Sequence, residues 1–264
     1  MTNILFILFL GNGDNIKIWN ENTKSKFLDR LKTLGDVYVY QDKSYNIIHY
    51  DLSDKKHLEY NNDINFDLSY IKVNNYVKMI YDDIKKKYKN YKYIPIGHSG
   101  GGLMALYFSQ IYYYNCIHCI LLDPATIHDI QYINKKYIIH SNTEFKKILL
   151  NIKNNDYDSI IKMENIIWNL RKLFYKKNLK LHFKVPTTSF YNIEKPEHNK
   201  GNNNLRLNDI KLMYQYNKKN YESIILINKT HYIFNNIQPA KQIIKYITNI
   251  ISEWKKIDLN IIRI

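Results

Sequence analysis

The stretch at residues 91–110, YKYIPIGHSGGGLMALYFSQ, constrains the fold more than any other part of the sequence. An apolar run typical of a strand leads into GHSGGG, which is followed by an apolar stretch compatible with a helix. The chain has only 8 glycines in 264 residues, and four of them lie between Gly97 and Gly102. Glycine serves where backbones approach closely or turn sharply. The pattern therefore predicts a tight strand-to-helix turn that presents Ser99.

On both sides of this turn, short apolar runs alternate with longer amphipathic segments. This alternation predicts an α/β fold with a mainly parallel, doubly wound sheet in one domain over residues 1–264. Residues 4–10, ILFILFL, are uniformly apolar, as a strand buried on both faces should be. Further strands are expected at 37–41, before Ser99, at 116–123, 179–191 and 223–228, with 46–52 either a strand or an irregular excursion.

Helices are expected near 21–34 and 70–89, after Ser99, and from about Pro239 to Lys255, where the proline suits a first turn. Two Asn-rich stretches, 59–64 and 201–208, are expected to be surface loops. Residues 141–178 interrupt the alternation, since their apolar spacing suggests two or three consecutive helices.

The composition favours a packed globule with a basic surface. Hydrophobic residues make up 45% of the chain, and the formal charge is +15 with a pI near 9.4. The lysines are spread along the chain, and no zinc-finger or RNP-like motif accompanies them. We therefore expect a solvated surface and no nucleic-acid partner, while peripheral contact with anionic lipid stays open.

The cysteines and the N-terminus bear on location. Cys116 and Cys119, in CIHC, have no second ligand pair, so we expect buried reduced thiols and no metal site. The apolar core near the N-terminus is too short and poorly flanked for a signal peptide, and no run approaches the roughly 20 apolar residues of a membrane span. These features predict a cytoplasmic protein without a transmembrane segment.

Ser99 is the candidate nucleophile. A strained turn between strand and helix can expose one side chain above the strand ends, provided that small residues flank it. Gly97 and Gly101 meet that requirement, and the helix beginning at Gly100 directs free N–H groups toward a developing oxyanion. The alternative, a phosphate-binding loop, would favour GxxxxGK[ST], and no lysine follows these glycines.

At this point the sequence resembles the α/β-hydrolase fold superfamily, and the resemblance extends over nearly the whole chain. LFLGNGDNIKIW at 8–19 looks like the family's HGxG segment, although Leu10 stands where the family usually has His. The match implies an oxyanion hole formed by the backbone N–H groups of Asn12 and Gly100. It also implies a trimmed sheet, because the first two strands of the typical fold are missing.

The resemblance also implies a general base. The family places its histidine between the last strand and the C-terminal helix, and in SIILINKTHYIF this position is occupied by His231. A loop imidazole without a catalytic role is the alternative. His98 directly precedes the nucleophile and is expected to be a positioning residue of the elbow.

Two residues compete for the triad acid. The usual family position, after the penultimate strand, falls at or beside Lys195, with Glu194 one residue earlier. Asp123 in CILLDPAT ends the preceding strand instead, which resembles a minority of lipases and esterases. We favour Asp123 and keep Glu194 as the alternative acid, since a turn aspartate before Pro124 is also common.

By the same resemblance, residues 125–178 form a helical cap over the nucleophile. Caps shape the substrate pocket and exclude water. Tyr157, Trp168, Phe174 and Tyr175 either line that pocket or hold the cap helices together.

The sequence therefore predicts a serine hydrolase, esterase-like or lipase-like, acting on a carboxylic ester or related small acyl substrate without a cofactor or metal. A catalytically inactive member that binds a ligand or partner is the alternative hypothesis.

Overall fold

The structure is a computed structural model, and it describes residues 3–11, 19, 24–39, 66–125, 183–193, 200–227 and 231–261. In this part of the chain one six-stranded sheet has the order β2-β1-β3-β4-β5-β6, with every neighbouring pair parallel. The strands are β1 (Asn3–Phe9), β2 (Asp36–Val39), β3 (Tyr91–His98), β4 (Cys119–Leu122), β5 (Thr187–Ile193) and β6 (Tyr221–Ile227). The predicted parallel α/β architecture is confirmed.

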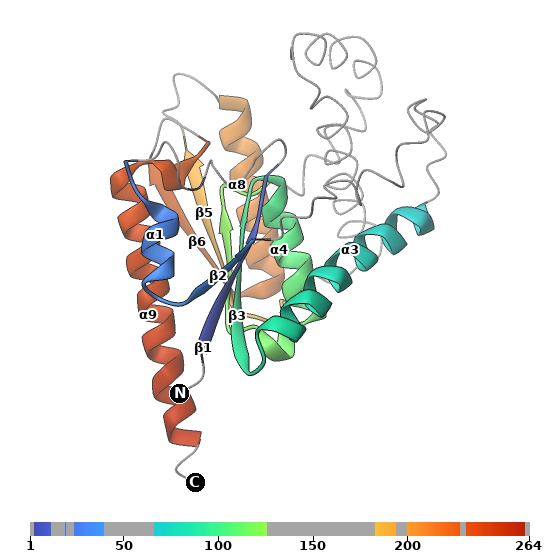
Figure 1. Cartoon of the computed structure of the whole chain (residues 1–264). Helices are drawn as coiled ribbons and strands as arrows, with labels where there is room; N and C mark the ends of the chain where they lie inside the picture. Colours follow the sequence, from blue (N-terminus) through green and yellow to red (C-terminus); the bar gives the residue numbers. More distant parts are fainter. Residues whose placement is uncertain are drawn as a thin grey trace, which may run out of the picture.

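Helices cover both faces of the sheet (Figure 1). On one face lie α1 (Phe27–Lys32) and α9 (Ile237–Ile261), and on the other lie α3 (Phe66–Lys87), α4 (Gly100–Ile111) and α8 (Lys200–Asn217). Two short 3-10 turns, η3 (Tyr113–Asn115) and η5 (Ile233–Asn235), precede β4 and α9. The sheet is doubly wound, as the alternation of segments predicts.

The alternation of side chains along each strand produces two cores. In β1, Leu5, Ile7 and Phe9 pack with the α3–α4 side, whereas Ile4, Phe6 and Leu8 pack with the α1–α9 side. Successive strand residues point to opposite faces, so a strand buried on both sides needs apolar residues at every position. This requirement explains the uninterrupted ILFILFL run.

The strand order places a topological switch between β1 and β3. From β1 the chain passes to β2 on one side, and then returns to β3 on the other side, where Phe9 pairs with Gly97. In open α/β sheets, ligands bind outside the carboxyl ends of the strands at such a point. The GHSGGG turn therefore begins at the position where a ligand site is expected.

Pro95 lies within β3 at an interruption of the ladder. The N–H of Ile117 donates to the carbonyl oxygen of Tyr93, so two residues later the nitrogen of Pro95 also faces β4. On this side the chain advances four residues from Cys116 to Ile120 while β3 advances three from Tyr93 to Ile96. The extra residue is a bulge, where a missing strand donor is tolerated.

Several predicted boundaries differ from those of the structure. The stretch 201–208, expected to be a loop, lies inside α8, because tertiary packing overrides the low helix propensity of asparagine. Helix α9 begins at Ile237, two residues before Pro239, and continues to Ile261. The expected cap, Tyr157, Trp168, Phe174 and Tyr175 lie outside the described residues, apart from Ala125.

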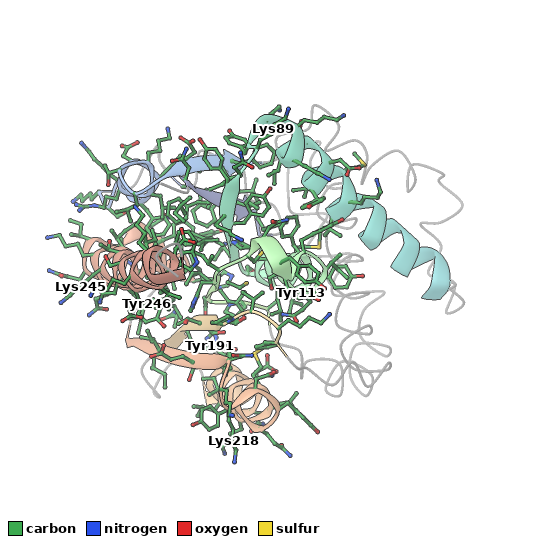
Figure 2. All side chains as sticks on the ribbon, turned by 90° about the horizontal axis from the view of Figure 1, so that it is seen from below. Lys89, Tyr113, Tyr191, Lys218, Lys245 and Tyr246 are labelled. Atoms are coloured by element: carbon green, nitrogen blue, oxygen red, sulfur yellow. The ribbon has the colours of Figure 1, made fainter. Side chains whose placement is uncertain are left out.

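Cys116 and Cys119 are buried free thiols. In Figure 2, the labelled lysines Lys89, Lys218 and Lys245 project outward from different sides of the molecule. Their spread agrees with the even distribution of lysine along the sequence. Within the described ranges, no helix is both long and apolar enough to cross a membrane.

Candidate active site

Ser99 sits on a strained turn between β3 and α4. Its backbone angles, φ 52° and ψ −123°, are rare for a residue with a side chain. The turn is fixed by hydrogen bonds, in which the N–H of Ser99 donates to Leu122 O at 3.1 Å and the Ser99 carbonyl accepts from Gly102 at 3.0 Å and Ala125 at 2.9 Å. The serine side chain is half-buried at the carboxyl ends of the strands.

The flanking glycines are required by close backbone approach. A Cβ on Gly97 would lie 2.1 Å from the carbonyl oxygen of Gly101, and one on Gly101 would lie 2.3 Å from Phe9 O and 2.4 Å from Leu10 O. A Cβ on Gly102 would lie 2.8 Å from Pro124 Cβ. The motif therefore brings the end of β1, the first turn of α4 and the segment after β4 into direct contact.

The predicted oxyanion hole is only partly described. Gly100, the first residue of α4, is buried, and free N–H groups of a first helical turn attract negative charge. Asn12 lies outside the described residues, but the preceding Leu10 packs its carbonyl against Gly101. The chain that leaves β1 therefore passes directly beside the first turn of α4.

Asp123 is a fully buried carboxylate directly after β4. Its backbone has φ 42°, and its N–H donates to Phe190 O at 2.7 Å. One carboxylate oxygen, Oδ1, accepts the backbone N–H of Asn192 at 3.0 Å. A buried charge is tolerated only when it is paired and hydrogen-bonded. The other oxygen, Oδ2, accepts hydrogen bonds from cationic or ring-nitrogen donors of two other residues.

His231 lies beside this carboxylate. Its Nδ1 is 2.5 Å from Asp123 Oδ2, and 42% of its side chain is exposed. Since an ionised carboxylate only accepts hydrogen bonds, Nδ1 carries the proton and Nε2 is left as a base. The structure thus brings together two of the residues predicted for the triad, from positions after β4 and after β6.

His98 holds the segment that carries His231. The His98 ring is buried and its Nε2 lies 3.2 Å from the His231 carbonyl oxygen, to which it donates because a carbonyl only accepts. The two imidazole rings are 4.5 Å apart between centroids, and the His98 ring also contacts Trp19, Tyr232 and Phe234. The neighbour of Ser99 is thereby tied to the backbone of His231.

Sequence reasoning missed Arg206. Its Nη2 donates to Asp123 Oδ2 at 3.0 Å from α8, and only 14% of its side chain is exposed. A signal existed, because the chain has only four arginines among 39 Lys and Arg residues, and arginine is the cation preferred for buried ion pairs. Glu194, the alternative acid, lies outside the described residues.

Comparisons with known proteins agree on the fold. No family model and no curated protein matches the chain. Among solved structures, a carboxylesterase of the thaumarchaeon Nitrososphaera gargenis is 13% identical with a TM-score of 0.55, covering 96% of this chain and 92% of its own.

Two further solved structures are similar over most of their length. A lipase-esterase related protein of Clostridium acetobutylicum is 16% identical with a TM-score of 0.54 and 94% of each chain covered. The thioesterase RedJ of Streptomyces coelicolor is 14% identical with a TM-score of 0.54, covering 92% of this chain and 88% of its own. The chain has the α/β-hydrolase fold.

The described part of the chain contains no group of three His, Cys, Asp or Glu side chains that could hold a metal ion.

Proposed function

We propose that the protein is a serine hydrolase acting on a carboxylic ester or a related acyl substrate. The observation that carries the proposal is the hydrogen bond between His231 Nδ1 and Asp123 Oδ2, formed at the strand ends where Ser99 is presented. A serine hydroxyl is protonated at neutral pH and needs a neighbouring base. A histidine oriented by a buried carboxylate is such a base.

In the proposed reaction, Ser99 Oγ attacks the carbonyl carbon of the substrate while His231 Nε2 takes the hydroxyl proton. Asp123 stabilises the resulting imidazolium. The proton then passes to the leaving group, which departs and leaves an acyl-serine. Water, activated by the same imidazole, attacks this ester, and release of the acid regenerates Ser99.

The negative charge of each tetrahedral intermediate needs fixed donors. The N–H of Gly100 belongs to the first turn of α4, which favours an anion, and the contact of Leu10 with Gly101 supports a second donor at Asn12. Loss of one such donor typically costs about 10²–10³ in turnover.

The substrate class follows from the chemistry of the site. Both esterases and thioesterases are among the similar solved structures, and both transfer an acyl group to a serine before water releases it. A small-molecule acyl ester or thioester is therefore the proposed substrate. The basic surface is assigned no role in the reaction.

Covalent labelling by a fluorophosphonate probe tests the proposal. We expect wild-type protein to be modified and Ser99→Ala to be unmodified, whereas Ser252→Ala, an exposed serine of α9, should react like wild type. Failure of the folded wild-type protein to react would support the inactive ligand-binding alternative and contradict the proposed function.

A further inference from the structure

We propose that Arg206 is a positioning residue whose fixed positive charge sets the pH at which the Asp123–His231 pair takes up a proton. The inference rests on the proposed function, because it assigns Arg206 to the acid–base pair of that site. It concerns a residue that neither the GHSGGG motif nor the spacing of the triad residues indicates.

The geometry gives Arg206 and His231 the same acceptor atom. Asp123 Oδ2 accepts from Arg206 Nη2 at 3.0 Å and from His231 Nδ1 at 2.5 Å, while Oδ1 accepts from the Asn192 backbone. Asp123 is fully buried and 14% of the Arg206 side chain is exposed. A charge-assisted bond between such groups is only weakly screened by solvent.

The resting state explains why a cation is needed. When His231 is neutral, Asp123 would otherwise be a buried anion with only neutral donors, which is strongly unfavourable. Arg206 cannot lose its proton and so remains a counter-ion at every working pH. It is the counter-ion of the carboxylate that accepts the hydrogen bond of His231 Nδ1–H.

The groups around the Asp123–His231 pair come from different segments of the chain. Asp123 follows β4, Arg206 reaches the pair from α8, His98 lies at the end of β3, and Tyr232 is adjacent in the chain. Among these contacts in the described residues, Arg206 is the one permanent cation. A fixed positive charge repels an added proton on the Asp123–His231 pair. This holds whether the proton is placed on the carboxylate or on the imidazole.

Loss of the Arg206 charge should raise the pH at which His231 is protonated. Removing the charge of Arg206 makes proton uptake easier, so His231 becomes an imidazolium at a higher pH. The protonated base cannot accept the serine proton, and the acid limb of the kcat/KM profile therefore moves to higher pH. A cation in hydrogen-bonding contact with a carboxylate typically shifts its titration by about 1 pH unit or more, and Asp123 shares its Oδ2 between Arg206 and His231.

An NMR titration of the His231 ring tests this without turnover, using Ser99→Ala as the background. In Arg206→Gln, which keeps a hydrogen-bond donor but no charge, we expect the midpoint to rise by about 1 pH unit. Arg206→Lys keeps the charge but lacks the planar guanidinium, so its His231 midpoint should lie between those of the Ser99→Ala background and Arg206→Gln. Arg30→Met is the control, since Arg30 lies on α1 and donates to the carbonyl oxygen of Ser25.

Each outcome is informative. An unchanged midpoint in folded Arg206→Gln, or equal shifts in the Gln and Lys variants, would overturn the proposal and leave Arg206 a structural clamp. If Arg206→Gln does not fold, Arg206→Lys alone decides. A rise of about 1 pH unit or more in the His231 midpoint of Arg206→Lys would then overturn the proposal. A shifted midpoint combined with failure of the fluorophosphonate to label folded wild-type protein would contradict the proposed function but not the role of Arg206.

Discussion

Two buried polar clusters lie at opposite ends of the same parallel sheet, and they handle charge differently. At the carboxyl ends, Asp123 is a buried anion between Arg206 and His231. Near the amino ends, His118 Nε2 lies 2.9 Å from Thr188 Oγ1, which lies 2.8 Å from the hydroxyl of Tyr246. Tyr246 comes from α9 and is labelled in Figure 2. That hydroxyl also donates to the exposed Glu222 carboxylate.

The amino-end cluster is neutral inside. Burial lowers the pKa of His118 from its ordinary value of 6.5 to about 4, and burial together with the Glu222 hydrogen bond raises the pKa of Tyr246 to about 12. Desolvation penalises the charged form of each group. A buried charge is retained only where counter-ions surround it, and this contrast separates the candidate catalytic cluster from a structural one.

Breaking the charged cluster should have the largest effect. Asp123→Asn keeps an oxygen for the Asn192 N–H but offers His231 an amide, so the imidazole loses its orienting anion. We expect ester turnover to fall by about 10⁴-fold, close to the loss in His231→Ala. Steady-state kinetics with a short-chain ester and circular dichroism of each variant measure this.

Glu194→Gln is the matched comparison, and it should retain most activity. If Glu194→Gln is inactive while Asp123→Asn turns over normally, the acid has been assigned to the wrong residue. In that case the hydrogen bond between Asp123 and His231 would have only a structural role.

The same contrast shows what the sequence can predict. The strands and the Ser99 turn follow from local patterns, because glycine clusters and apolar runs reflect constraints within a few residues. Asp123 and His231 are expected only through the resemblance to the α/β-hydrolase fold. Arg206 could not be placed in this way. Its contact depends on how α8 packs across the sheet, and its Asn-rich surroundings predict a loop instead.

Acidification should destabilise the fold through the neutral cluster. The native pKa of His118 lies below its unfolded value, so the unfolded chain binds more protons between about pH 6.5 and 4. The stabilising contribution is complete above pH 6.5 and is lost as the pH falls toward 4, by on the order of 3 kcal/mol.

Urea unfolding at pH 7.5 and 4.5 checks this expectation. His118→Gln cannot take up a proton, and the difference in unfolding free energy between wild type and variant should shrink or reverse at the lower pH. A difference that is independent of pH would show that His118 is not buried in its neutral form.

The smallest effect is expected for Tyr246→Phe. The change removes the hydroxyl that connects Thr188 with Glu222 and leaves the ring packed against Phe190 at 5.5 Å between centroids. Loss of such hydrogen bonds typically costs about 1 kcal/mol. We expect a small decrease in thermal stability at unchanged turnover, and a large loss of turnover would contradict the separation of the two clusters.

The position of Asp123 along the chain has a consequence for biosynthesis. The residues that bind its side chain, Asn192, Arg206 and His231, follow 69, 83 and 108 residues later. Because synthesis proceeds from the N-terminus, Ser99 and its turn leave the ribosome long before these partners exist. Until they arrive, desolvation of Asp123 is too costly, and the carboxylate stays hydrated. Each new molecule therefore carries its nucleophile for some time before it can acquire the acid–base pair that would activate it.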